Sequence, residues 1–248
     1  MRAWVGTSGW QYASWKGRFY PKDVPQRQWL DFFSARFPTV EVNNSFYRLP
    51  EETSFDRWRE ESPAGFLFVL KASRYITHIR RLRDASASVA LFWSRATRLK
   101  EKLGPVLFQL PPKFRADPAL LTEFLAVLPD GLRAAFEFRD DSWQQDAVLD
   151  SLNRAGAAWV MADRPGVRTP SITTGGWSYI RFHQGRALQS GYTRAKLRAW
   201  ADRIIELGVE ETFAFFNNDG LAAAPADAET LAGLLLDRGQ AVASPKRS

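Results

Sequence analysis

Three short apolar runs each end in a pair of polar residues that stand two positions apart. The pairs are Glu41 with Asn43, Glu137 with Arg139, and Arg181 with His183. Side chains two apart on a β-strand share one face, so each pair points one way while Val42, Phe138 and Phe182 point the other. Carboxylates beside cations and a histidine are the groups that acid–base catalysis and anion binding use.

Other apolar runs also end in polar residues, and we expect all of them to share one pocket. The added positions are Lys71, Gln109, Asp163, Asn217 and Asn218. Glu41 and Glu137 are the predicted acid and base, because two carboxylates in different environments can have separated pKa values. The predicted catalytic set is completed by Lys71, His183 and Asp163. A buried ion-pair network that only closes the core is the alternative; it accounts for one pair but poorly for polar residues at so many strand ends.

The runs that carry these residues alternate with segments of helical periodicity. The predicted strands are Arg2–Gly6, Thr39–Asn43, Phe66–Lys71, Val106–Leu110, Ala134–Phe138, Ala158–Ala162, Tyr179–His183 and Thr212–Asn217. The predicted helices are Gln26–Phe37, Ser54–Glu60, Ser86–Leu103, Pro118–Leu128, Gln144–Arg154, Arg194–Leu207 and Asp227–Arg238. The link Arg164–Gly176 is rich in Gly, Pro and Thr, so we expect it to be irregular.

Regular alternation of strands and helices predicts an α/β fold with a parallel sheet. Eight such units match a closed (β/α)8 barrel, which typically has about 250 residues. An open doubly wound sheet would place a G-x-G-x-x-G loop after its first strand, and the first loop, residues 6–12, does not continue that way. We therefore predict a single barrel domain over residues 1–242, a flexible tail over 243–248, and a site at the C-terminal ends of the strands.

The loops at that end are rich in arginine and aromatic residues. Arg74, Arg80, Arg81 and Arg83 surround His78 after the third strand, which is the pattern of a phosphate clamp or of a solvated run of charge. The aromatic residues that we expect to offer a stacking surface for a base or a sugar are Trp10, Tyr12, Tyr47 and Trp143.

Composition narrows the class of protein. Lys and Arg number 34 against 27 Asp and Glu, which gives a net charge of +7. This excess favours an anionic small molecule or nucleic acid as the partner, although a basic surface that serves only solubility fits equally well. The absence of cysteine excludes a thiolate nucleophile and a disulfide. No signal peptide and no long apolar stretch are evident, so we predict a cytoplasmic protein without membrane contact. We also expect the protein to be a monomer.

Motifs that follow one another along nearly the whole chain include Gly6-Thr7-Ser8-Gly9-Trp10, Val40-Glu41-Val42-Asn43, Lys71-Ala72-Ser73-Arg74, Phe108-Gln109-Leu110-Pro111-Pro112, Glu137-Phe138-Arg139 and Phe216-Asn217-Asn218-Asp219. Together they resemble the YecE-like family, domain of unknown function seventy-two. The resemblance implies a TIM-barrel fold and brings no established reaction. Two positions depart from the pattern of similar proteins: Gln184 stands between His183 and Gly185, and Asp227 replaces an asparagine.

We predict an enzyme of hydrolase or isomerase type that acts on a phosphate-bearing substrate, either nucleic acid or a sugar phosphate. The predicted substrate-binding residues are Trp10, Tyr12, Asn43, Tyr47, Arg74, His78, Gln109, Arg139, Trp143, Arg181, Asn217 and Asn218. The sequence requires no metal, but Glu41, Glu137 and Asp163 are the set that would hold Mg²⁺ or Mn²⁺. The alternatives are a glycoside hydrolase with paired carboxylates and a non-catalytic nucleic-acid-binding protein; inward-facing Glu41 and Glu137 favour an enzyme.

Overall fold

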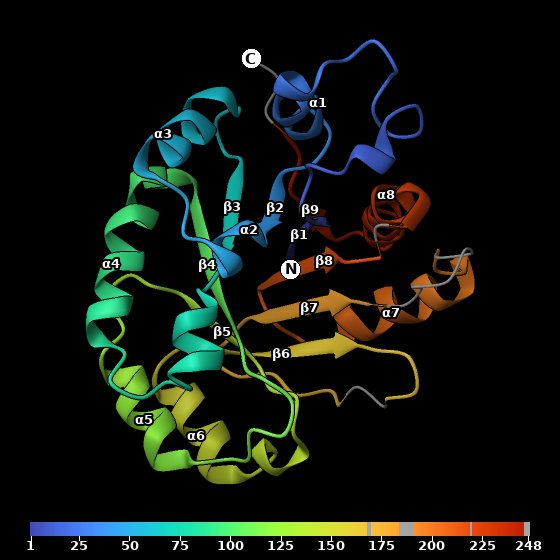
Figure 1. The fold of residues 1–248 in the computed structure, drawn as a ribbon. Coiled ribbons are helices and arrows are strands. Elements are labelled where there is room, and N and C mark those ends of the chain that lie inside the picture. Colours follow the sequence, from blue (N-terminus) through green and yellow to red (C-terminus); the bar gives the residue numbers. More distant parts are fainter. Residues whose placement is uncertain (168–169, 184–190, 219, 246–248) are drawn as a thin grey trace.

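The fold is a closed barrel of eight parallel strands, seen in a computed structural model that describes residues 1–167, 170–183, 191–218 and 220–245. The strands are β1 (Arg2–Ser8), β2 (Thr39–Val42), β3 (Leu67–Lys71), β4 (Leu103–Gln109), β5 (Ala134–Glu137), β6 (Ala158–Asp163), β7 (Ser178–Phe182) and β8 (Glu211–Phe216). Each pairs with the next along the chain, and β1 closes the barrel by pairing with both β8 and β2 (Figure 1). The predicted strand count and fold class are confirmed.

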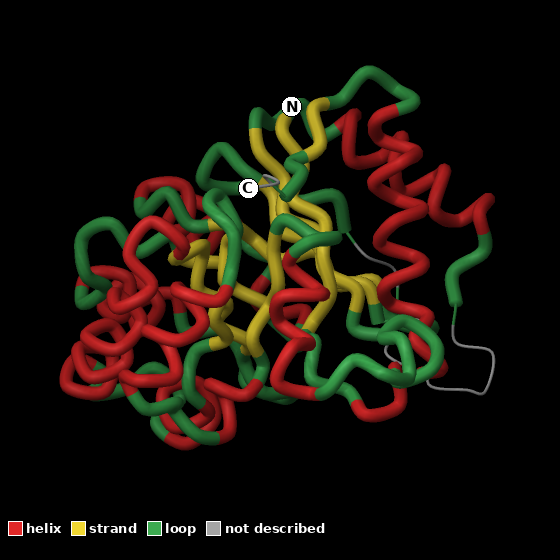
Figure 2. Tube along the Cα trace, turned by 90° about the horizontal axis from the view of Figure 1, so that it is seen from above, coloured by secondary structure: helices red, strands yellow, loops and turns green. Residues whose placement is uncertain are grey.

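Helices cover the outside of the barrel, except for the short α2 (Asn44–Tyr47), which lies near the C-terminal ends of β2 and β3. The others are α1 (Trp29–Ser34), α3 (Glu52–Glu61), α4 (Ser86–Ala96), α5 (Pro118–Ala126), α6 (Asp146–Arg154), α7 (Arg194–Glu206) and α8 (Ala223–Leu236). Helices α3 to α6 lie on one side of the strands and α7 and α8 on the other (Figure 1), and the view from above shows helices outside strands (Figure 2). The described part of the link between β6 and β7 contains no helix, as its composition predicts; residues 168 and 169 lie outside that part.

Two of the observed helices differ from the predicted ones in where they begin or end. The first predicted helix opens as a 3₁₀ turn over Gln26–Gln28 before α1 begins. Helix α4 ends at Ala96, and a 3₁₀ segment, Thr97–Lys102, follows it with a kink at Lys100, whose backbone is not helical (φ 51°, ψ −126°). Between β3 and α4 the chain also forms a π-helix over Tyr75–Ile79, a rare element that often occurs at functional sites.

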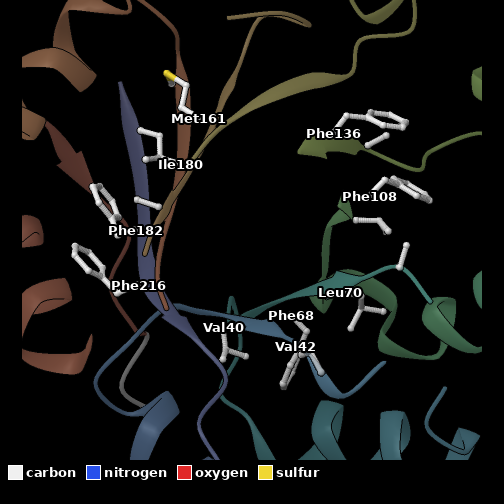
Figure 3. Packing of buried hydrophobic residues seen from close by; sticks show 14 of the residues in the cluster. Val40, Val42, Phe68, Leu70, Phe108, Phe136, Met161, Ile180, Phe182 and Phe216 are labelled. Carbon is white, nitrogen blue, oxygen red and sulfur yellow. The ribbon is translucent and has the colours of Figure 1, made fainter. Parts of the chain in front are cut away.

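The larger hydrophobic core lies between the strands and the helices. Its strand residues are those of one face, among them Val42, Phe108, Phe138 and Phe182, all buried. In Figure 3 the labelled side chains of this layer point away from the centre of the barrel. Val42, Phe138 and Phe182 therefore face the helices, opposite to Glu41, Glu137 and Arg181, which face inward as predicted.

The interior of the barrel changes from apolar to polar along the strands. A second core fills the end at which the strands begin, and it contains Trp4, Val69, Leu107, Tyr179 and Phe213. Trp4 stacks on Phe213 with ring centres 5.9 Å apart and closes that end. One or two inward positions further along, buried charged and polar side chains replace the apolar ones, so the polar residues form a layer at the C-terminal end of the strands.

Gly6 lies where β1 and β2 begin to pair. A Cβ atom built on Gly6 would lie 2.2 Å from the carbonyl oxygen of Thr39, so no side chain fits there. The absence of a side chain lets the two strands close the barrel immediately below Ser8 and Glu41, which pair in register.

The end of the described chain returns to the first strand. Strand β9 (Ala241–Val242) pairs with Arg2 and Ala3 of β1, and the Ala243 N–H donates to the Ala3 carbonyl. Residues 246–248 of the predicted tail lie outside the described residues. In the described ranges, no helix is long and apolar enough to cross a membrane.

Candidate active site

A buried guanidinium lies at the centre of the polar layer. Arg181, from β7, donates from Nε to Glu41 Oε2 (2.9 Å) and from Nη2 to Glu41 Oε1 (2.7 Å). Its third nitrogen, Nη1, donates to Glu137 Oε2 at 2.5 Å. Ser8 and Tyr179 complete the shell of Glu41 by donating to Oε1 (2.7 Å) and Oε2 (2.6 Å). Glu41 thus accepts four hydrogen bonds and has no lone pair directed at a substrate.

A chain of hydrogen bonds extends from Glu137 to the neighbouring strands. Gln109 donates from Nε2 to Glu137 Oε2 (2.9 Å), and its Oε1 accepts from Lys71 Nζ (2.9 Å). Arg139 donates from Nε to Glu137 Oε1 at 3.0 Å. Five of the residues predicted for one pocket, Glu41, Lys71, Gln109, Glu137 and Arg181, are therefore connected in a single network, with Arg139 at its edge.

Charge within the network fixes the protonation of both carboxylates. Burial alone would raise the pKa of Glu41, but the charge and hydrogen bonds of Arg181, with those of Tyr179 and Ser8, outweigh it and hold that pKa below its usual value. Burial opposes the charged form of Glu137 too, and Arg181, His183 and Arg139 hold its pKa well below the usual range. Both side chains are ionised at neutral pH, so neither carries a proton to donate.

His183 follows β7 at the same end of the barrel. Its Nδ1 lies 3.1 Å from Asn217 Nδ2, so Asn217 donates to Nδ1 and the proton of the neutral ring lies on Nε2. Burial and Arg181 lower the pKa of His183 to about 4, which makes the ring neutral at pH 7. The Nε2 atom is buried and has no hydrogen-bond partner among the described residues, and the same is true of Asn43 Oδ1 after β2.

Phe46 and His78 close over Lys71. The Lys71 Nζ lies 4.1 Å from the centre of the Phe46 ring, and the edge of that ring packs on His78 with centres 5.0 Å apart. Burial, followed by the charges of Lys71, Arg139, Arg74 and Arg81, lowers the pKa of His78 to about 4. His78 therefore lies within electrostatic reach of Lys71 and Arg139, as predicted for a residue at the mouth.

The predicted arginine patch divides into paired and unpaired members. Arg80 bonds to Asp84 (2.6 Å) and Arg83 to Asp117 (3.4 Å). Arg74 and Arg81 are exposed and form no ion pair with any described residue. The backbone that carries them is unusual: the π-helix ends at Ile79, and Arg81, like the buried Leu82, has a positive φ. Non-glycine residues in this conformation cluster at ligand-binding sites.

Asp163 does not join the other predicted residues. Its Oδ2 accepts from Tyr192 Oη (2.7 Å) and pairs with Lys196 Nζ (2.9 Å), and it lines a groove beside α7. The reason is strand parity: Ala158 and Val160 of β6 face the barrel interior, so Asp163 faces the helices. Placing Asp163 in the central pocket was wrong.

Trp10 and Trp143 belong to the core instead of a substrate surface. Trp143 is fully buried, donates from Nε1 to the Phe114 carbonyl (2.6 Å), and stacks on Phe138 at 4.6 Å. Trp10 is buried against Trp58. Both residues come shortly after a strand in the chain, but their rings pack in the core between the strands and the helices. The order of residues in the chain does not show this.

The remaining predicted residues lie nearer the rim. Tyr12 donates to the Ser8 carbonyl (2.6 Å) and lines a small pocket with Asn43, and Tyr47 is 80% exposed. Asn218 is buried and donates to Asp227 Oδ2 (2.7 Å), so it supports α8. Asp227 also accepts from the Tyr192 N–H, while Gln184 lies outside the described residues.

The proposed carboxylate set does not fit a divalent metal. Glu41 and Glu137 are held by Arg181, whose guanidinium occupies the oxygens that a cation would need, and Asp163 faces the helices. In the part of the chain that the structure describes, no group of three His, Asp or Glu side chains is arranged to bind a metal.

Three residues that contact the network lie outside the predicted catalytic and substrate-binding sets: Ser8, Tyr179 and Phe46. Ser8 and Tyr179 hold Glu41, and Phe46 covers Lys71. Tyr179 stands two residues before Arg181 on β7, so the same alternation that predicted Arg181 and His183 carries the signal for it.

A closed parallel barrel with its polar side chains gathered at the C-terminal ends of the strands defines a TIM-barrel protein. The chain belongs to the family described as "Protein of unknown function DUF72", whose sequence profile matches residues 4–248. This confirms the resemblance seen in the motifs.

Relatives of known sequence or structure agree with this assignment. The UPF0759 protein YunF of Bacillus subtilis is 26% identical over 253 residues, covering 87% of this chain and 88% of that protein. A DUF72 family protein of Thermotoga maritima is 27% identical, with a TM-score of 0.86 over 95% of this chain and 100% of the other. A D-psicose 3-epimerase of Clostridium cellulolyticum, solved with D-tagatose, shares only the fold: it is 10% identical with a TM-score of 0.59 over 98% and 100% of the two chains.

Proposed function

We propose that this protein is an enzyme that acts on a sugar phosphate at the C-terminal mouth of its barrel. The observation that carries the proposal is a pair of buried atoms, His183 Nε2 and Asn43 Oδ1, that have no partner among the described residues and lie at the cation-rich end of the strands. Buried polar atoms without partners are rare in folded proteins and call for an explanation. Hydrogen bonds from a ligand at this end of the barrel supply one.

The charge at the mouth supports an anionic ligand. In the described network Arg139 and Arg181 pair with the two carboxylates Glu41 and Glu137, and a third cation, Lys71, bonds to the neutral Gln109 beside them. Arg74 and Arg81 add unpaired positive charge at the rim. An anion placed among these groups interacts with them in a partly desolvated environment, where such interactions are stronger than in water.

The two unpartnered atoms support a hydroxyl-bearing anion over a bare phosphate. His183 Nε2 is a donor and can bond to a phosphate or a carbonyl oxygen. Asn43 Oδ1 is an acceptor and needs an O–H or N–H from the ligand. A sugar phosphate offers both kinds of group, whereas fully ionised phosphate offers only acceptors.

The state of the carboxylates disfavours a glycoside hydrolase. That reaction needs one carboxyl group with a raised pKa to protonate the leaving oxygen, and the pKa values of Glu41 and Glu137 are both lowered. Lys71 is instead the group whose protonation is balanced near neutral pH, because burial and Arg181 lower its pKa to about 8. This favours an isomerase-type proton transfer over hydrolysis.

Calorimetric titration of three probes tests the substrate class: ribose 5-phosphate, inorganic phosphate and ribose. We expect ribose 5-phosphate to bind most tightly and ribose least. Asn43→Leu should weaken ribose 5-phosphate about tenfold, the value of roughly one hydrogen bond, and leave inorganic phosphate unchanged. Equal binding of ribose and ribose 5-phosphate, or no binding of either at millimolar concentration, would contradict the proposal.

Binding of single-stranded nucleic acid is a second candidate, favoured by two exposed rings. Tyr47 (80% exposed) lies in α2 after β2, and Tyr75 (48%) begins the π-helix after β3, next to Arg74 in the chain. Exposed aromatic rings beside cations are a stacking platform for bases. Tyr75→Ala should then weaken an oligonucleotide and leave ribose 5-phosphate unaffected; an oligonucleotide that binds no better than ribose 5-phosphate removes this candidate.

A further inference from the structure

Lys71 is placed unlike an ordinary surface lysine. It ends β3 on the inward face, two residues after Val69 of the interior core, and only 8% of it is exposed. Its Nζ donates to an amide oxygen, Gln109 Oε1, and no described carboxylate lies within ion-pairing distance of it. A lysine buried without a carboxylate partner loses much of the stabilisation of its positive charge.

The cations around Lys71 act in the same direction. Burial is the largest cause that lowers the Lys71 pKa to about 8, and the charge of Arg181 follows; Glu41 and Glu137 act against them. At pH 7 about one Lys71 in ten is then a neutral amine, against fewer than about one in a thousand for a lysine of ordinary pKa. Desolvation and a neighbouring cation are the two means by which proteins activate a lysine as a nucleophile.

The neighbours of Lys71 also hold it in one orientation. Gln109 donates from Nε2 to the ionised Glu137, which fixes its Oε1 toward Lys71 Nζ. The Phe46 ring lies on another side of the amine at 4.1 Å. One hydrogen of Lys71 bonds to Gln109. The neutral amine therefore keeps one hydrogen and a lone pair for a ligand.

We propose that Lys71 is a covalent nucleophile that forms an imine with the aldehyde or ketone carbon of a phosphorylated substrate. The inference rests on the proposed function and specifies it: the sugar phosphate reacts in its open-chain carbonyl form. His183 Nε2–H is a donor at the same end of the barrel and is available to another oxygen of the substrate. Arg139 and the rim arginines hold the phosphate.

The step is balanced within these groups. The neutral amine of Lys71 attacks the carbonyl carbon, a C–N bond forms and the C=O π bond opens to a carbinolamine. The two hydrogens that the amine loses leave with the oxygen as water, and a C=N bond replaces the C=O bond. No oxidant, reductant or metal is consumed. Protonation of the imine makes it an electron sink, which acidifies the neighbouring C–H bond and fits an isomerase-type reaction.

Reductive trapping on the full-length protein tests the proposal. The protein is incubated with dihydroxyacetone phosphate and sodium cyanoborohydride, and the site of the stable secondary amine is found by peptide mass mapping. We expect one adduct per chain, at Lys71, and a loss of that adduct in Lys71→Arg. The matched control is Lys113→Arg, which removes an exposed lysine from the loop after β4 and should leave the adduct intact.

The pH dependence separates an activated lysine from an adventitious one without any variant. The rate of trapping at Lys71 should rise about fivefold from pH 7 to 8 and then level off near pH 9, as a pKa of about 8 requires. The rate of trapping at an ordinary lysine would continue to rise about tenfold per pH unit up to about pH 10. A profile of the second kind at Lys71 overturns the proposal even if some adduct forms there.

Two failures can be told apart by titrating dihydroxyacetone phosphate in the absence of reductant. If it binds but the adduct is absent or spread over surface lysines, the role of Lys71 is wrong and the proposed function stands. If neither dihydroxyacetone phosphate nor ribose 5-phosphate binds, the proposed function is wrong as well. Unphosphorylated dihydroxyacetone should react far more slowly at Lys71; equal rates would contradict a phosphorylated substrate while supporting Lys71 as the nucleophile.

Discussion

Arg181 binds Glu41 through two parallel hydrogen bonds, Nε to Oε2 at 2.9 Å and Nη2 to Oε1 at 2.7 Å, inside a barrel where both side chains are almost completely buried. The two residues come from β7 and β2, which do not pair with each other. Their bond therefore ties the two sides of the mouth together and, through Glu137 and Gln109, sets the environment of Lys71.

Glu41→Gln should destabilise the protein by about 3–5 kcal/mol, because it leaves the charge of Arg181 buried without its main partner. Glu137→Gln should cost less, since Arg181 keeps both bonds to Glu41 and the other partner, Arg139, is partly exposed. Chemical denaturation measures both. Equal losses, or a Glu41→Gln variant as stable as the parent, would contradict the central place of the Arg181–Glu41 bond.

Acid should weaken the fold through the two histidines. Their folded pKa values are about 4, against 6.5 in an unfolded chain. Between pH 6.5 and 4 the unfolded chain binds more protons than the folded one, so stability falls with falling pH in that window and is constant with respect to these groups below it. His183→Gln should reduce the slope of unfolding free energy against pH by up to about 1.4 kcal/mol per pH unit.

Denaturation series at several pH values check this slope. Glu41 and Glu137 contribute at lower pH: their folded pKa values lie below 4.5, so the stability they provide is present above that value and is lost as the pH falls through the folded ones. An unchanged slope between pH 6.5 and 4 in the His183→Gln variant would show that the folded pKa of His183 is not lowered.

Trp143→Ala should lower stability by about 3–5 kcal/mol, as expected for removal of a fully buried aromatic side chain. The surviving folded protein should bind ribose 5-phosphate as the parent does, because Trp143 packs on Phe114 and Phe138 outside the mouth. Denaturation gives the first quantity and calorimetry below the transition gives the second. A weaker affinity with unchanged stability would return Trp143 to the substrate site.

Charge reversal separates the unpaired arginines from the paired ones. Arg74→Glu and Arg81→Glu should weaken ribose 5-phosphate and reduce the dependence of its affinity on salt, because each removes an unscreened attraction. Arg80→Glu and Arg83→Glu serve as controls of equal charge change, and we expect smaller effects since Asp84 and Asp117 already neutralise those side chains. The affinity of each variant is measured at low and at high salt. If all four charge reversals weaken ribose 5-phosphate equally at both, the attraction comes from the general positive charge of the surface and not from a defined phosphate site.

The sequence predicts the fold and the inward face of most strands, because polar and apolar residues alternate along those strands and show which side chains point inward. Glu41, Glu137 and Arg181 each stand beside an apolar residue that packs under helices, so their direction follows from period two. Strand β6 lacks this signal: Ala158–Asp163 is buried along its whole length, on both faces. The sequence of β6 therefore does not show which face Asp163 lies on, and in the structure Asp163 faces α7.

Pairing partners and loop paths lie beyond such reasoning. Arg181 has two carboxylates and Glu137 two arginines in reach, and only the positions of the strands around the barrel decide which bonds form. Trp10 and Trp143 follow strands in the same way as Phe46 does, yet only Phe46 reaches the polar layer. The four hydrogen bonds that Glu41 accepts are likewise a property of these three-dimensional contacts.

The most direct test of the account uses the fact that the chain has only two histidines. Nitrogen-15 spectra of protein labelled at histidine report the protonation and hydrogen bonding of each ring, and a His78→Gln variant assigns the two sets of signals. At pH 7 we expect a neutral His183 ring with its proton on Nε2, and a shift of that Nε2 signal on addition of ribose 5-phosphate but not of ribose. A charged His183 ring at pH 7, or a His183 signal that saturating ribose 5-phosphate leaves unmoved, would contradict an anion-binding site at the mouth of this barrel.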